Sequence, residues 1–139
     1  MHQWWARRPL GSCRAVLLGL LIPDPCDPAC PETFKLKARE LLSAITKGVE
    51  RSSDELLRDK LLVFIADFAN WDLSSNVSYL EVARGLVKSA YNGEAPLVVD
   101  TFAGGGAIPL EALRTGCDTH SSDLNPVACL IEKVLIETI

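Results

Sequence analysis

The sequence has no excess of basic residues. Its 139 residues include 14 Lys and Arg against 18 Asp and Glu, which gives a formal net charge of −4 at pH 7. Nucleic acids are bound mainly through Lys and Arg placed against phosphates. The charge balance therefore argues against a nucleic-acid footprint in this segment. If a nucleic acid is the substrate, most of its contacts lie elsewhere.

The chain also lacks a disulfide pattern and a long hydrophobic run. Its five cysteines are odd in number, which suits reduced thiols in the cytoplasm. Cys26 and Cys30 have C-x-x-x-C spacing, but no second pair of ligands is nearby, so we interpret them as loop thiols rather than a zinc site. The apolar run 15–22 is too short to cross a membrane and has no cleavage site after it. We therefore predict a buried helix over 10–21 instead of a signal peptide.

The most informative stretch is residues 97–116. An apolar run ending at Asp100 is typical of a strand, and the spacing of leucines over 109–114 predicts a helix, with Gly116 as its stop. Between them stand three consecutive glycines, 104–106. Because glycine has no Cβ, a ligand can lie against main-chain N–H groups at the helix N-terminus. Glu111 is interpreted as an acid of the first helical turn without a function.

A second strand-like stretch, 118–122, precedes Asp123. A dinucleotide fingerprint requires a small residue where this chain has Pro109, so that ligand is disfavoured. The pattern D-x-F-x-G-x-G over 100–106 favours S-adenosylmethionine, and the Asp123 carboxylate can accept hydrogen bonds from both ribose hydroxyls of an adenosine. Asn125 then predicts an N-cap, with proline at the first position of another helix.

Residues 32–93 predict a helical layer. Apolar residues recur at helical spacing over 32–47, and S-x-x-E capping boxes at Ser52 and Ser78 predict the starts of two further helices. The last of these helices ends at Asn92 and Gly93. We interpret Trp71, in the turn between those two helices, as an aromatic plug rather than a substrate contact. Four of the eight prolines fall within 23–31, which predicts a stiff linker.

Residues 98–113 together with 122–128 resemble the cofactor half of Class I methyltransferases that modify exocyclic amines in DNA. Residues 2–10 and 64–72 narrow the resemblance to a family of adenine-specific DNA methylases with an N-terminal domain of unknown function. The resemblance covers nearly all of the chain. One departure is Thr101, where the family usually has proline.

The resemblance implies an α/β fold in which residues 94–139 begin a Rossmann-like domain, with parallel strands near 96–100 and 118–122. A mainly helical segment, 32–93, precedes it. Residues 1–31 supply a helix that completes the cofactor pocket, followed by the Pro-rich linker. A second interpretation stays open, in which Trp4 and Trp5 only pack onto the core while Arg7 and Arg8 are solvated. Parallel sheets need more than two strands and cover on both faces. We therefore expect an N-terminal fragment, with the rest of the sheet in missing sequence or a partner chain.

The resemblance also implies S-adenosyl-L-methionine as cofactor, DNA as the partner of the full-length protein, methylation of adenine and a role in restriction-modification. Asp100 would orient the methionine ammonium, Asp123 would bind the ribose and Leu124 would flank the adenine. A second interpretation stays open for both acids, in which each only caps the adjacent loop or helix. The predicted cofactor-binding residues are His2, Arg7, Pro9, Asp100, Phe102, Ala103, Gly104, Gly105, Gly106, Asp123 and Leu124.

The family's catalytic motif, Asn or Asp followed by Pro-Pro and an aromatic residue, is absent. Residues 125–127 match it only in part and are interpreted as a helix cap. We therefore assign no catalytic residue and no metal ligand, and predict that this chain alone does not methylate DNA. Two alternatives stay open, a fragment of an RNA or small-molecule methyltransferase and a non-catalytic scaffold that keeps the fold.

Overall fold

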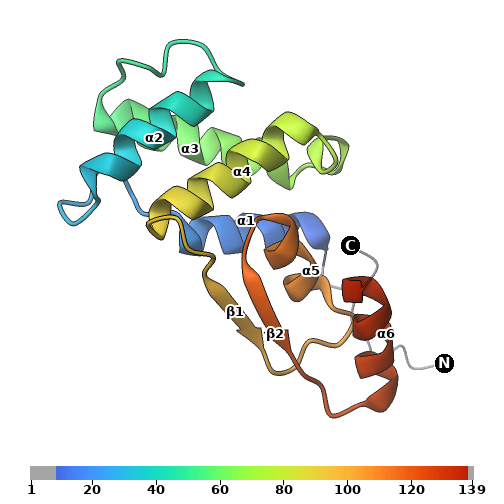
Figure 1. Ribbon diagram of the computed structural model, residues 1–139. Coiled ribbons are helices and arrows are strands. Elements are labelled where there is room, and N and C mark those ends of the chain that lie inside the picture. The colour runs from blue at the N-terminus through green and yellow to red at the C-terminus, as the bar shows by residue number, and fades with distance from the viewer. Residues whose placement is uncertain (1–8, 138–139) are drawn as a thin grey trace.

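The computed structural model describes residues 9–137, which form six α-helices, one 3-10 helix and a sheet of two parallel strands (Figure 1). The order is helical first and mixed afterwards, as the sequence predicts. A sheet of two strands is too small to define a Rossmann fold, so that assignment stays a prediction. The elements are α1 (Leu10–Leu21), α2 (Glu32–Ser43), α3 (Asp54–Ala69), η1 (Trp71–Leu73), α4 (Val77–Ala90), β1 (Leu97–Asp100), α5 (Ala107–Arg114), β2 (Asp118–Ser121) and α6 (Pro126–Glu137).

Helix α1 joins the two parts of the molecule. Helix α2 packs against α3 and α4, whereas α1 packs against α3 on one side and α5 on the other. Figure 1 shows α1 between the helical layer and the sheet. Each large apolar side chain that is fully buried contributes about 1.5–3 kcal/mol, so the core accounts for most of the stabilisation. The fully buried large apolar residues are Phe34, Leu42, Leu57, Phe68, Leu86 and Val87 from the layer, Val49 from the connection between α2 and α3, and Leu18 from α1.

Helix α1 has the predicted bounds but is buried on one face only. Leu17 and Leu18 lie in the core, while Val16 and Leu20 are 62% and 77% exposed. The expectation of a buried helix is therefore wrong for the face that carries Val16 and Leu20. Arg14, by contrast, is fully buried, which the apolar pattern did not predict.

Both predicted capping boxes are displaced. The N-cap of α3 is Ser53, whose hydroxyl accepts a hydrogen bond from the Leu56 amide, while the Ser52 hydroxyl donates to a carbonyl of the preceding turn. The N-cap of α4 is Asn76, and its side-chain oxygen accepts from the Ser78 amide at 3.0 Å. The asparagine oxygen stands two residues ahead of Ser78 and satisfies the first free amides of α4.

Two further expectations differ from the structure. Helix α2 ends at Ser43 rather than near residue 47. The amides of Ala44 and Ile45 donate to carbonyls three residues back, as in a 3-10 turn, instead of four residues back as in an α-helix. Trp71 lies in the predicted turn but is 73% exposed, so its interpretation as an aromatic plug is wrong. The linker 23–31 contains neither helix nor strand, as predicted.

Strands β1 and β2 pair in parallel, with Leu97 opposite Asp118 and Asp100 opposite Ser121. Helix α5 connects them, and Val98 packs against the core. On the alternate face, Leu97 and Val99 are 63% and 55% exposed. One face of the sheet is thus covered and the other open. Within residues 9–137, no helix combines the length and the apolar character needed to span a membrane.

Candidate cofactor site

The glycine loop is ordered by backbone bonds. The Phe102 amide donates to the Asp100 carboxylate at 3.1 Å, and the Ala103 amide donates to the carbonyl of Ser122, beyond β2, at 3.2 Å. Gly104 and Gly106 both have positive φ, +54° and +74°, a region that side chains strongly disfavour. The glycine run therefore permits the loop to turn from β1 into α5.

Asp123 joins the loop to the end of the second strand. One of its oxygens accepts the Gly104 amide at 2.9 Å and the other accepts the Asn125 amide at 2.8 Å. The backbone N–H groups of Asn125, Gly104 and Leu124 lower the pKa of this carboxyl below its usual range. Asp123 is thus an anion at neutral pH and holds both loops in one arrangement.

The loop offers acceptor capacity and accessible backbone to a ligand. A carboxylate has about four acceptor positions, so Asp123 keeps capacity for hydroxyl donors beyond its two strong amide bonds. A Cβ built on Gly104 would meet no atom within 4 Å, so the loop backbone is approachable there. Phe102, the first residue of the loop 102–106, is 77% exposed, and Leu124, which follows Asp123, is 92% exposed.

The structure brings most of the predicted residues together. The parallel register places the carboxyl ends of β1 and β2 side by side, and with them Asp100, the loop 102–106, Asp123 and Leu124. Pro9 is exposed at the N-cap of α1. His2 and Arg7 lie outside the described residues 9–137.

A pocket of about 260 Å³ adjoins the loop along α6. Its Glu132 is 4% exposed, and the Oε1 atom of this side chain is buried without a hydrogen-bond partner. A Cβ on Gly106 would lie 3.4 Å from Cγ of Glu132, so α6 supports the loop from behind. The residues that line the pocket are Ser121, Cys129, Glu132, Lys133 and Ile136.

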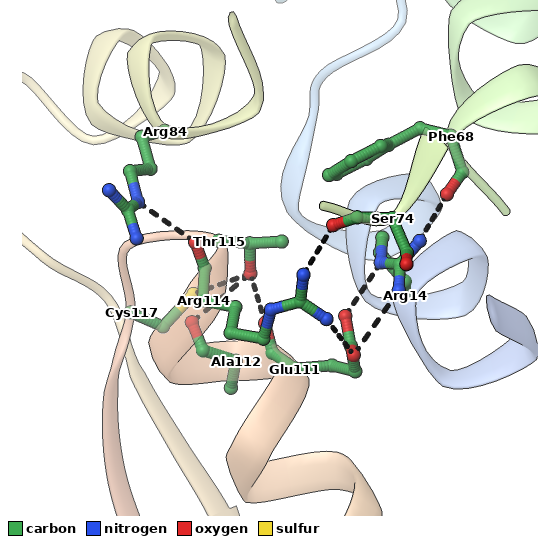
Figure 2. Close-up of polar contacts among 9 residues, drawn as sticks. All are labelled: Arg14, Phe68, Ser74, Arg84, Glu111, Ala112, Arg114, Thr115 and Cys117. Atoms are coloured by element: carbon green, nitrogen blue, oxygen red, sulfur yellow. Dashed lines mark hydrogen bonds and ion pairs between the residues drawn. The ribbon is translucent and has the colours of Figure 1, made fainter. Parts of the chain in front are cut away.

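A buried ion pair that the sequence did not reveal lies next to the loop helix. Arg14 Nε is 2.6 Å from Glu111 Oε2, and the two side chains are 1% and 0% exposed (Figure 2). Nη2 of Arg14 donates to the other Glu111 oxygen at 3.3 Å, and Nη1 donates to the Phe68 carbonyl. The guanidinium also lies 4.6 Å from the centroid of the Phe68 ring. Glu111 is the fifth residue of α5, so its interpretation as a first-turn acid is wrong.

Arg114 extends this network towards the surface. Its Nη1 donates to Glu111 at 2.9 Å and its Nη2 to the Ser74 carbonyl, while Arg84 donates to the Arg114 carbonyl at 2.9 Å (Figure 2). One sequence signal for this ion pair was available: Arg14 and Glu111 each share a helix face with apolar residues, which indicates that both are buried.

The cysteines form no metal centre in the part of the chain that the structure describes. No group of three or more His, Cys, Asp or Glu residues there is placed to hold a metal ion. None of the five cysteines forms a disulfide, and burial raises the pKa of the Cys30 and Cys117 thiols. These two thiols are therefore weakly reactive at neutral pH.

Comparison with known protein families finds a match at the N-terminal end of the chain. A family described as a protein of unknown function, DUF1156, matches residues 1–45. No curated protein and no solved structure matches the chain. The match covers the N-terminal segment through α2 and does not extend to the glycine loop. The resemblance to an N-terminal domain of unknown function is thus supported, and the methyltransferase part depends on the loop residues.

Proposed function

We propose that this chain is the cofactor-binding portion of an S-adenosylmethionine-dependent DNA adenine methyltransferase, which in the full-length protein methylates the exocyclic amine of adenine. The bond from the Gly104 amide to Asp123 carries the proposal. This bond joins the glycine loop, which follows β1, to the acid that follows β2. The proposed cofactor uses the loop for its methionine end and the acid for its adenosine end.

The roles follow from the chemistry of each group. The loop 102–106 wraps the methionine end, and Asp100 orients its ammonium. Asp123 accepts hydrogen bonds from the ribose hydroxyls, while Leu124 flanks the adenine. The cofactor supplies a methyl group on a sulfonium. His2, Arg7 and Pro9 are proposed to complete the methionine end.

DNA and further strands are the proposed partners. We propose that missing sequence or a partner chain completes the sheet and covers its open face, where Leu97 and Val99 are exposed, because parallel sheets are normally covered on both faces. The net charge of −4 favours DNA contacts that lie mostly outside this chain. We also propose a cytoplasmic location and a role in restriction-modification.

Calorimetric titration with S-adenosylmethionine tests the proposal. We expect binding to the wild-type chain, no binding of NAD, and weaker binding to Asp123→Ala. Because Asp123 also orders the loop, the same titration is repeated with the cofactor analogue lacking the ribose 2′-hydroxyl. Weaker binding of the analogue supports the ribose contact. A folded wild-type chain that does not bind S-adenosylmethionine would favour the scaffold alternative.

A methylation assay addresses the missing catalytic motif. We expect the purified chain to incorporate no methyl group into adenine of duplex DNA, because no residue is assigned to hold the acceptor amine. Methyl incorporation by this chain alone contradicts that expectation. Incorporation into RNA instead of DNA would favour the RNA alternative.

A further inference from the structure

The burial of Arg14 depends on the position of Glu111. A buried charge is tolerated where it is paired and hydrogen-bonded. Arg14 satisfies this requirement entirely with groups from other helices, namely the Glu111 carboxylate of α5 and the Phe68 carbonyl of α3. Displacement of α5 would leave the guanidinium buried without its counter-charge. The pair therefore fixes α5 relative to α1 and α3.

Helix α5 transmits this constraint to the glycine loop. It has eight residues, and a helix this short is not stable by itself, so the contacts around it determine its place. The Gly106 carbonyl accepts the Leu110 amide at 3.0 Å, directly before Glu111. The loop thus ends in the first turn of α5, directly before Glu111.

We propose that Arg14 is a positioning residue of the glycine loop, acting through Glu111 to fix α5 and so the loop 102–106. The segment that matches the family of unknown function contains Arg14. One role of that segment is then to support the loop of a cofactor site. The proposal depends on the proposed function for its effect on affinity, whereas its effect on the order of the loop is independent of any ligand.

Hydrogen exchange of the full chain tests the effect on loop order, with Arg14→Met compared against Arg39→Met. Arg39 is a matched control because it also pairs with a carboxylate of another helix, Asp54, at 2.6 Å, and donates to a backbone carbonyl. We expect Arg14→Met to accelerate exchange at the amides 103–106 by about tenfold, and Arg39→Met to change them by less than about twofold.

Two outcomes would overturn the proposal. The first is unchanged loop exchange in a folded Arg14→Met variant. The second is equal acceleration in the loop and in α2, which indicates a general loss of stability. Should Arg14→Met fail to fold, Glu111→Gln replaces it, because glutamine keeps the shape and one acceptor oxygen while removing the charge. Its loop exchange is then expected to exceed that of Arg39→Met.

Titration with S-adenosylmethionine supplies the second readout. We expect Arg14→Met to weaken binding about tenfold and Arg39→Met to leave it unchanged, because a shifted α5 moves the loop amides away from the positions that a bound cofactor requires. Unchanged affinity in Arg14→Met contradicts the link to the cofactor. If the wild-type chain binds no S-adenosylmethionine, the proposed function fails, and the exchange experiment still decides the role of Arg14.

Discussion

The helical layer and the strand–loop unit (residues 97–125) are stabilised in different ways. In the layer of α2, α3 and α4, side chains such as Phe34 and Leu57 are completely buried. In the strand–loop unit, Leu97 is 63% exposed, and much of the order comes from amides that donate to carboxylates such as Asp123. Apolar burial thus dominates one region and directional polar bonds the other.

This difference makes the site dependent on the layer. Backbone hydrogen bonds contribute about 0.5–1.5 kcal/mol each, less than a buried large apolar side chain. The strand–loop unit therefore depends on its contacts with α1, where Glu111 is the counter-charge of the buried Arg14. Variants on either side of that contact test the comparison.

Glu111→Leu is expected to cost about 4 kcal/mol of unfolding free energy, because it leaves Arg14 as an uncompensated buried charge. Urea unfolding followed by circular dichroism measures the change. The double variant Arg14→Met with Glu111→Leu removes both charges and is expected to recover most of the loss. A double variant as unstable as the sum of two single variants would show that the pair has no special coupling.

Leu57→Ala, in the centre of the layer, is expected to cost about 3 kcal/mol by the same measurement. Leu57 has no exposed surface, so its truncation leaves a cavity. Leu62 lies on the same helix but is 57% exposed, and Leu62→Ala is expected to cost less than about 0.5 kcal/mol. Equal costs at the two positions would contradict the placement of the core.

Asn76→Ala is expected to destabilise the chain by about 1 kcal/mol, because its side-chain oxygen caps α4. Ser78→Ala serves as the control, since Ser78 contributes its backbone amide and not its side chain to the cap. Thermal unfolding compares the two variants. A larger loss for Ser78→Ala would restore the capping box predicted from the sequence.

The loop is expected to lose order in acid. The pKa of Asp123 is lower in the folded chain than the value of about 3.9 for an unfolded Asp. The stabilisation is therefore complete above that value and declines as the pH falls through the lowered pKa. Amide chemical shifts of Gly104 and Asn125 between pH 6 and pH 2 follow the change. Asp123→Asn is expected to remove the transition at both amides.

The sequence predicted those parts of the fold that depend on local signals. The glycine run, the strand before it and the N-cap at Asn125 all appear where residue type alone indicated them, and Asn125 accepts the Val127 amide at 2.9 Å. Where two nearby polar residues could each cap a helix, the predicted N-cap was wrong: Ser53 caps α3 instead of Ser52, and Asn76 caps α4 instead of Ser78. The S-x-x-E signature depends on a serine and a glutamate and takes no account of other acceptors nearby.

Contacts between distant residues could not be predicted. Arg14 and Glu111 are 97 positions apart, and no local pattern links them. The exposure of Trp71 likewise depends on how α3 and α4 pack, which a short turn does not reveal. For the candidate site, residue types near the loop were sufficient to predict that Asp123 lies beside the glycines. The contacts that support the loop, from Glu111 and from Glu132, could not be predicted.

The two left-handed glycines predict different tolerance in a mutational scan. At Gly104 a new side chain would meet open space, so a substitution there carries backbone strain alone. At Gly106 the same methyl group would lie in van der Waals contact with α6, 3.4 Å from Glu132 and 3.5 Å from Leu135, so a larger side chain would meet that helix. Variation at the first glycine is therefore limited by its backbone conformation alone, and at the second by the neighbouring helix as well. The same three-glycine run is thus open at its start and bounded by α6 at its end.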